Sequence, residues 1–148
     1  MSRAFVKETA EAAPPPERMV AEGRNLVTRE GLAQIEGHVA RLEAALKHDP
    51  GNRETLERDL RYWSAAKASA EVGPRGPDGI VAFGSHVVIA RKGREQRFRI
   101  VGEDEADPAH GLINFRAPLA AAIIGAQVGD VIEAGEPLGE ITVLSIEN

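Results

Sequence analysis

The sequence predicts an α+β protein in which an antiparallel α-helical coiled-coil hairpin precedes a small antiparallel sheet with one short helix. Three observations support this fold class. Apolar residues in the first half recur at helical spacing, a cluster of glycines and prolines follows, and beyond it the apolar period falls to two. The predicted organisation is a disordered arm at 1–26, a hairpin at 27–72, a linker at 73–79 and a sheet domain at 80–148.

The first helix is predicted from a run of apolar residues spaced alternately three and four apart. The run consists of Leu32, Ile35, Val39, Leu42 and Leu46. This is the spacing of a coiled-coil seam, which no strand keeps. Thr28 is a good N-cap just before the run, and Glu30 suits the positive end of the helix.

The return helix follows a short turn, Asp49-Pro50-Gly51-Asn52, in which the proline and glycine end the first helix. Its predicted apolar stripe is formed by Leu56, Leu60, Trp63 and Ala70. We expect Trp63 to pack in the seam. We expect His38 and the charged run 57–59 to lie on solvated faces.

The second half predicts short strands joined by turns. The expected strands lie at 80–83, 86–90, 96–101, 112–115, 131–133 and 140–146. Pro118 opens a short helix at 119–124, which Gly125 ends; proline at the start and glycine past the end is the usual polarity. One helix covering a face of an antiparallel sheet is an α+β arrangement.

Composition excludes several classes of function. The formal charge of −5 and pI near 5.4 argue against direct grip on a nucleic-acid backbone, so any such role goes through a protein partner. Without cysteine there is no disulfide or thiolate metal site. No apolar run has membrane-spanning length, and we expect a cytoplasmic location. Phosphate-binding glycine loops and nucleophile elbows are absent from the sequence.

Carboxylates near the hairpin tip are the main candidates for chemistry. Asp49 lies in the turn, and Glu54 and Glu57 share a face of the return helix at i, i+3. They could complete the coordination of a magnesium ion that a partner holds. The alternative is that acidic residues simply suit a helix N-terminus. The four histidines are scattered over different elements, so the sequence predicts no metal site of its own.

Two blocks of the sequence resemble the Gre family of bacterial transcription elongation factors. The first is LVTREGL at 26–32, followed by the apolar spacing described above. The second is a series of motifs in the family's order: VAFGSHV at 81–87, IVGEDEAD at 100–107, APLA at 117–120, IIG at 123–125 and GD at 129–130. The resemblance covers the start of the hairpin and nearly all of the C-terminal domain.

The resemblance implies an FKBP-like C-terminal domain that docks beside the secondary channel of RNA polymerase. In Gre factors the hairpin enters this channel, and tip carboxylates help the polymerase to cleave backtracked RNA. It therefore implies that the partner is RNA polymerase. It also implies that the chain is an accessory factor rather than an enzyme, and that it at most assists the polymerase's own RNA cleavage. It implies no cofactor beyond magnesium shared with the polymerase active site.

The hairpin tip departs from the family pattern. Gre hairpins are longer and carry an Asp-x-x-Glu pair that is absent here. Aligned from the hairpin base, Glu54 and Glu57 imitate its spacing; aligned on the Ala65-Ala66-Lys67 motif, Leu56 and Asp59 occupy the two positions. We expect little or no stimulation of cleavage, because hydrolysis tolerates little misplacement of metal ligands.

The predicted docking loop departs as well. Gre factors use an Asp-Ser-Pro-like sequence to touch the polymerase, whereas this chain has Arg116-Ala117-Pro118 with Asn114 just before it. The resemblance assigns docking to Asn114, Arg116 and Pro118. The alternative function is a non-catalytic, protein-binding regulator, resembling nucleoside diphosphate kinase regulators, that occludes the channel or competes with Gre factors.

Overall fold

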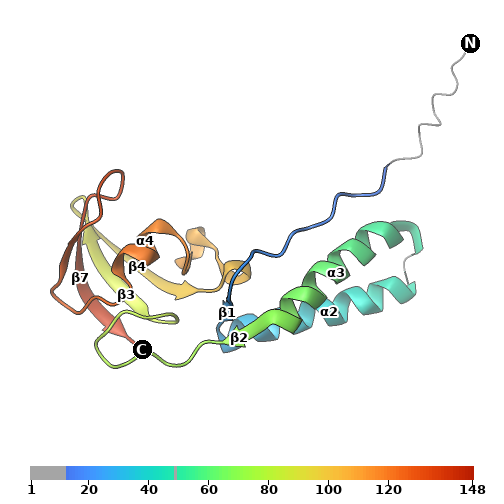
Figure 1. Cartoon of the computed structure of the whole chain (residues 1–148), viewed down its shortest axis with the longest axis horizontal. Helices are drawn as coiled ribbons and strands as arrows, with labels where there is room; N and C mark the ends of the chain where they lie inside the picture. The colour runs from blue at the N-terminus through green and yellow to red at the C-terminus, as the bar shows by residue number, and fades with distance from the viewer. Residues whose placement is uncertain (1–12, 49) are drawn as a thin grey trace, which may run out of the picture. The chain divides into compact units, whose positions relative to one another are not determined.

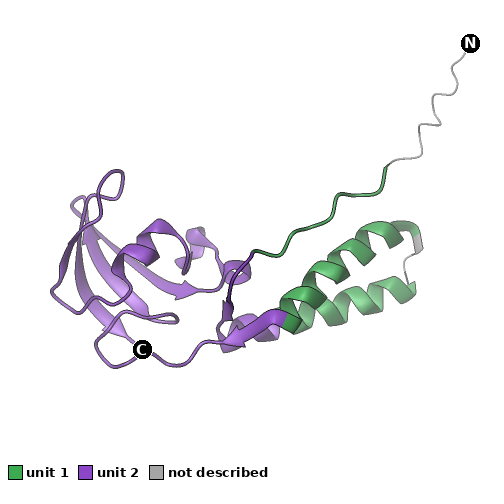
Figure 2. Cartoon of the chain, viewed as in Figure 1, with its two compact units in different colours: residues 1–21, 35–68 green, residues 22–34, 69–148 purple. Residues whose placement is uncertain are grey.

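A computed structural model describes residues 13–48 and 50–148 of the chain. The chain forms two compact units, which Figure 2 distinguishes by colour. Unit 1 contains the described residues of 13–21 and 35–68, and unit 2 contains residues 22–34 and 69–148. The first turns of the first helix and the last residue of the second helix therefore belong to unit 2, and the rest of the two helices belongs to unit 1.

The hairpin consists of two helices joined by a short 3-10 turn. Helix α2 spans Arg29–His48, η1 spans Pro50–Asn52 and α3 spans Arg53–Ser69, and the two long helices run antiparallel and side by side (Figure 1). The predicted stripe on α2 is confirmed: Ile35 and Val39 are buried, and the three leucines of the stripe are half-buried.

The predicted stripe on α3 is partly wrong. The buried residues of this helix are Tyr62 and Ala66, while Leu56, Leu60 and Trp63 are half-buried. Ala70 lies beyond the helix, in a short strand. The apolar seam therefore runs along a line displaced from the predicted one, so that residues 62 and 66 occupy its centre.

Two expected solvated positions are also wrong. The His38 ring stacks on Trp63 with centroids 3.9 Å apart and planes 11° apart, which closes one edge of the seam. In the charged run, the Arg58 and Asp59 side chains are only 21% and 23% exposed and form an ion pair with each other. The spacing of apolar residues identifies the centre of a seam, but polar residues beside it are half-buried too.

A two-stranded sheet, not predicted from the sequence, lies where the hairpin begins and ends. Strand β1, Asn25–Val27, pairs in parallel with β2, Ala70–Val72, and the backbone N–H of Gly73 continues the pairing by donating to Val27 at 3.0 Å. Strands of three residues are too short to show a period. β1 begins within the segment 1–26, of which residues 1–12 lie outside the described part.

Unit 2 contains a five-stranded sheet with the order β5-β4-β3-β7-β6. The strands are β3 His86–Arg91, β4 Arg94–Val101, β5 Leu112–Asn114, β6 Val131–Glu133 and β7 Glu140–Glu147. The sheet is mixed rather than purely antiparallel, because β5 pairs in parallel with β4. The connection from β4 to β5 contains two 3-10 turns, η2 Glu103–Glu105 and η3 Pro108–His110.

The predicted strand at 80–83 is wrong. Ile80 makes only an isolated bridge to Gln127, and the Val81 backbone instead exchanges hydrogen bonds with Gly125 and Ala126. Val81 is buried all the same, so its apolar character reflects a core position outside any strand.

The core of unit 2 lies between the sheet and α4, Pro118–Ile123, whose start at the proline is confirmed (Figure 1). Ala120 and Ile123 are buried against residues from three central strands. The strand residues of this core that are fully buried are Ile89, Ile100, Ile141 and Val143. In β4, Phe98 and Ile100 belong to this core.

Candidate functional site

The hairpin tip lies between His48, which ends α2, and Arg53, which begins α3. Of the three predicted tip carboxylates, Asp49 lies outside the described residues. Glu54 is in the first turn of α3 and is exposed. Among the described residues near this tip, Glu54 therefore presents its carboxylate to solvent.

Glu57 is held differently from Glu54. Its Oε2 lies 3.4 Å from the Nε of Arg53, one helical turn earlier, and its side chain is 42% exposed. Within the described parts of the chain, no three His, Asp or Glu side chains gather in a way that could hold a metal ion. A hard cation takes oxygen ligands, and Mg²⁺ commonly has only one or two carboxylates among them, so these two glutamates form a partial ligand set.

The three predicted docking residues lie where the chain turns from β5, which ends at Asn114, into α4. The side-chain Oδ1 of Asn114 accepts a hydrogen bond from the Arg116 N–H at 3.0 Å, and its carbonyl accepts one from Ala117 at 2.8 Å. Pro118 then begins α4. These bonds fix the turn, and they leave Arg116 and Pro118 exposed on unit 2.

The Arg116 guanidinium reaches the residues that precede β1. Its Nη2 donates to the Arg24 carbonyl at 2.7 Å, and its centre lies 5.3 Å from the Phe115 ring centroid. Gly23 has a φ of +91°, and a Cβ there would lie 2.9 Å from the same nitrogen. The basic residue at this position therefore holds the incoming chain, a role that the sequence did not reveal.

A buried carboxylate fixes the start of α2 within unit 2. Glu105, only 9% exposed, accepts hydrogen bonds from the backbone N–H groups of Thr28 at 2.9 Å and Gly102 at 3.0 Å. The Thr28 hydroxyl also donates to Glu105, and it accepts from the Gly31 N–H at 3.0 Å, which confirms the predicted N-cap. One carboxylate thus satisfies three donors around a helix start.

This arrangement leaves no room for a side chain at position 31. A Cβ built on Gly31 would overlap the carboxyl group of Glu105. Sequence reasoning identified the N-cap and, separately, the motif at 100–107, which contains the acidic loop 103–107. It missed their contact because the two lie 77 residues apart, and only the fold brings them together.

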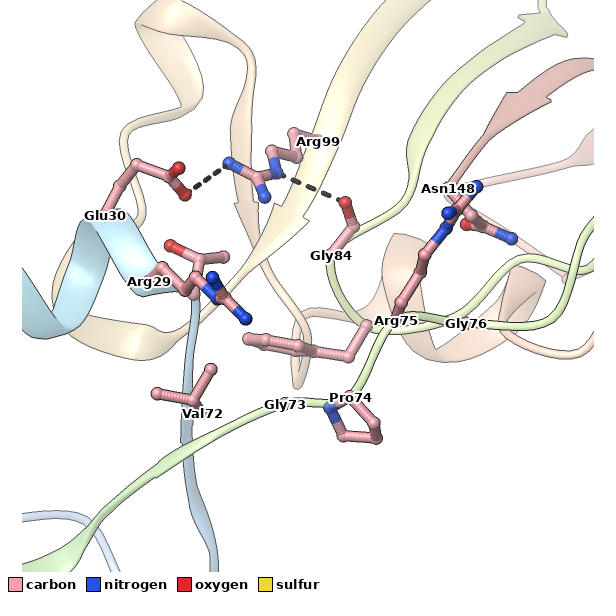
Figure 3. Close-up of a pocket in the computed structure, with 12 residues that line it drawn as sticks. Arg29, Glu30, Val72, Gly73, Pro74, Arg75, Gly76, Gly84, Arg99 and Asn148 are labelled. Atoms are coloured by element: carbon pink, nitrogen blue, oxygen red, sulfur yellow. Dashed lines mark hydrogen bonds and ion pairs between the residues drawn. The ribbon is translucent and has the colours of Figure 1, made fainter.

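A cavity of about 510 Å³ lies beside this helix start in unit 2 (Figure 3). At its edge, Arg99 pairs with Glu30 at 3.1 Å and donates to the Gly84 carbonyl at 3.2 Å. The pKa of Glu30 is lowered, first by its own backbone N–H and then by Arg99. Gly73, from the predicted linker, lies so close to the Phe83 ring that only glycine fits. The linker is thus packed as part of the cavity wall.

Comparison with known proteins identifies relatives over most of the chain. Residues 76–148 match the family described as "Transcription elongation factor, GreA/GreB, C-term". Transcription elongation factor GreA of Cereibacter sphaeroides is 35% identical over 113 residues, covering 74% of this chain and 72% of the relative. GreB of Yersinia pestis is 38% identical over 102 residues, covering 66% and 60% of the two chains.

A third relative, GreA of Lactococcus lactis, is 42% identical over 65 residues, covering 43% of this chain and 42% of its own. Among solved structures, the GreA factor homolog 1 of Thermus thermophilus has a TM-score of 0.42 at 21% identity, covering 85% of this chain and 100% of that one. No helix in the described residues is long and apolar enough to cross a membrane.

Proposed function

The chain belongs to the GreA/GreB family of transcription elongation factors, and we propose that it binds RNA polymerase near the secondary channel and modulates elongation and backtracking. The names of the relatives favour this function over the alternative of a regulator related to nucleoside diphosphate kinase regulators. The observation that carries the proposal is the rigid, exposed turn from Asn114 to Pro118, within the part that matches the family.

Docking at this turn fits its chemistry. Arg116 and Pro118 are exposed, and the hydrogen bonds of Asn114 hold them in one conformation, so a partner need not order the loop on binding. The guanidinium keeps donors beyond the one that bonds Arg24. We propose that it faces an acidic or carbonyl-rich surface of the polymerase.

We further propose that this protein stimulates RNA cleavage weakly or not at all. Glu54 is available at the tip, but Glu57 is engaged with Arg53. Magnesium bound in the polymerase would supply the Lewis acid for hydrolysis. The hairpin's own contribution would be limited to carboxylate oxygens from these two residues, and a displacement of about 1 Å in such a group can cost on the order of 100-fold in rate.

Cleavage of RNA in stalled, backtracked polymerase complexes tests both parts of this proposal. We expect the protein alone to give little cleavage, and to inhibit cleavage by an added GreA relative through competition for the same site. Efficient cleavage that disappears in the Glu54→Gln, Glu57→Gln double variant would contradict the second part. Glu43→Gln, an exposed carboxylate on α2, is the matched control.

Docking is tested separately by measuring polymerase affinity. Arg116→Glu should weaken binding about tenfold or more, because it replaces a donor with a repelled charge. Arg94→Glu, at an exposed β-turn of the same unit, is the control with the same charge change. Equal affinity of both variants and the unmodified protein would exclude the Asn114–Pro118 turn from the interface. A melt confirms that Arg116→Glu stays folded.

A further inference from the structure

Part of the N-terminal arm contacts α3 within unit 1. Arg61 donates two hydrogen bonds to the carboxylate of Glu17, at 2.7 and 2.8 Å. The next arm residue, Arg18, places a guanidinium nitrogen 3.3 Å from Asp59. Two consecutive arm residues thus meet two oppositely charged residues that lie two positions apart on α3. We call this contact the arm clasp.

The arm clasp also covers the aromatic residues of the hairpin. The guanidinium carbon of Arg18 lies 4.1 Å from the Tyr62 ring centroid and 5.6 Å from that of Trp63. Trp63 in turn stacks on His38 from α2. A cation above an aromatic face and beside a carboxylate is a favourable arrangement. The surface on α3 is therefore complementary in charge to an arginine that follows an acidic residue.

The arm is suited to reversible binding. Pro14, Pro15 and Pro16 directly precede the clasp residues and restrict the backbone, so less conformational entropy is lost on docking. The Arg61 and Glu17 side chains are 58% and 53% exposed, and exposed ion pairs are individually weak. The contact can therefore form and release without unfolding the helices.

We propose that the face of α3 formed by Asp59, Arg61, Tyr62 and Trp63 is an interaction surface for an extended acidic-arginine segment, and that the arm clasp occupies it in the free protein. A polymerase segment of the same chemistry binds there once the arm leaves. The arm thereby holds back polymerase binding. This last step rests on the proposed function.

The fluorescence of Trp63, the single tryptophan, reports directly on the clasp. Quenching by acrylamide should increase about twofold or more in the Glu17→Ala, Arg18→Ala variant, because the guanidinium no longer shields the ring. Arg24→Ala is the matched control, since it removes an arm arginine that pairs with Glu71 in unit 2 instead. Equal quenching in all three proteins would overturn the clasp.

A charge exchange distinguishes loss of the clasp from damage to the hairpin. Glu17→Arg alone should raise quenching, and adding Arg61→Glu should restore the original value by reforming the ion pair in reverse. Failure of this rescue would overturn the specific pairing of arm and helix. Arg53→Glu, which changes a different arginine of α3, should give no rescue.

Polymerase affinity then tests the regulatory step. If the clasp competes with the polymerase, the Glu17→Ala, Arg18→Ala variant should bind about threefold more tightly than the unmodified protein, and Arg24→Ala should not. Unchanged or weaker binding by the clasp variant would overturn competition. If no form of the protein binds polymerase, the proposed function fails, whereas the quenching measurements still decide whether the clasp exists.

Discussion

The hairpin and the sheet domain differ in how they are stabilised. The sheet domain buries a continuous cluster of ten hydrophobic residues between its strands and α4. In the described part of the hairpin within unit 1, the buried hydrophobic residues are Ile35, Val39, Tyr62 and Ala66. The rest of the seam is half-buried and is bordered by stacked rings and ion pairs. A two-helix rod has one apolar seam, so polar residues at its edges take a larger share of its stability.

The largest expected effect is in the sheet. Ile141→Ala, at a fully buried position of β7, should reduce the free energy of unfolding by about 4 kcal/mol, because it leaves a cavity in a closed core. Hydrogen exchange measured by mass spectrometry reads the amides of β3 and β7 separately from those of α3. A loss below about 1 kcal/mol would show that this core collapses around the cavity, as a one-sided seam does.

The second largest effect is expected at the start of α2. Gly31→Ala should destabilise the protein by about 3 kcal/mol, since the new methyl group must displace the buried Glu105 carboxylate from its three donors. The measurement is denaturant unfolding. The sign is informative, because glycine to alanine within a helix ordinarily stabilises by roughly 1 kcal/mol.

Gly37→Ala is the control on the same helix. A Cβ at this position meets only the mobile end of the Arg41 side chain, at 3.1 Å. We therefore expect a stabilisation of about 0.5 kcal/mol from helix propensity. If both alanines stabilise, Glu105 does not constrain the helix start.

A smaller effect is expected in the hairpin seam. Leu60→Ala should cost only about 1 kcal/mol, because Leu60 is half-buried and borders a surface hollow of about 380 Å³. Thermal melts followed by Trp63 fluorescence give the value. A loss as large as that of Ile141→Ala would remove the contrast between the two regions.

The smallest effect is the acid sensitivity of the arm clasp. The hydrogen bond from Arg61 lowers the pKa of Glu17. Burial alone would raise the pKa of Asp59, but hydrogen bonds from Arg58 and Arg18 together lower it. Groups with a lowered pKa stabilise the contact above their ordinary pKa, near 4, and lose this contribution as the pH falls through the lowered value.

Acrylamide quenching of Trp63 should therefore stay constant from neutral pH down to about pH 4 and rise below it. The Glu17→Ala, Arg18→Ala variant provides the baseline, because it retains the His38 ring that stacks on Trp63. A rise centred well above pH 5 in the difference between the two proteins would contradict control by these two carboxylates.

The sequence predicted those parts of the fold that depend on local periodicity or on turn residues. The stripe from Leu32 to Leu46, the N-cap at Thr28 and the start of α4 at Pro118 are confirmed. These features each follow from a few neighbouring residues. The strand predicted at 80–83 is wrong. A short apolar run indicates that its residues are buried, but it does not show how their backbone is paired.

The candidate site could be predicted only in part. The sequence grouped Asn114, Arg116 and Pro118, and the structure places them in one turn. It could not reveal that Arg116 holds the Arg24 carbonyl or that Glu17 meets Arg61, because these contacts join residues 92 and 44 positions apart. The spacing of charged residues along the sequence does not show which of them meet in the folded chain.

The close fit of Gly31 against Glu105 has a consequence for how this chain can change. A residue larger than glycine at position 31 and a shortened side chain at 105 are each unfavourable alone, the first through overlap and the second through orphaned donors at Thr28 and Gly102. In the double variant the shorter side chain at 105 removes the overlap at 31, so the two sites should show epistasis in a double-mutant cycle. Divergence of the helix start and of the acidic loop is therefore linked, although 74 positions separate them.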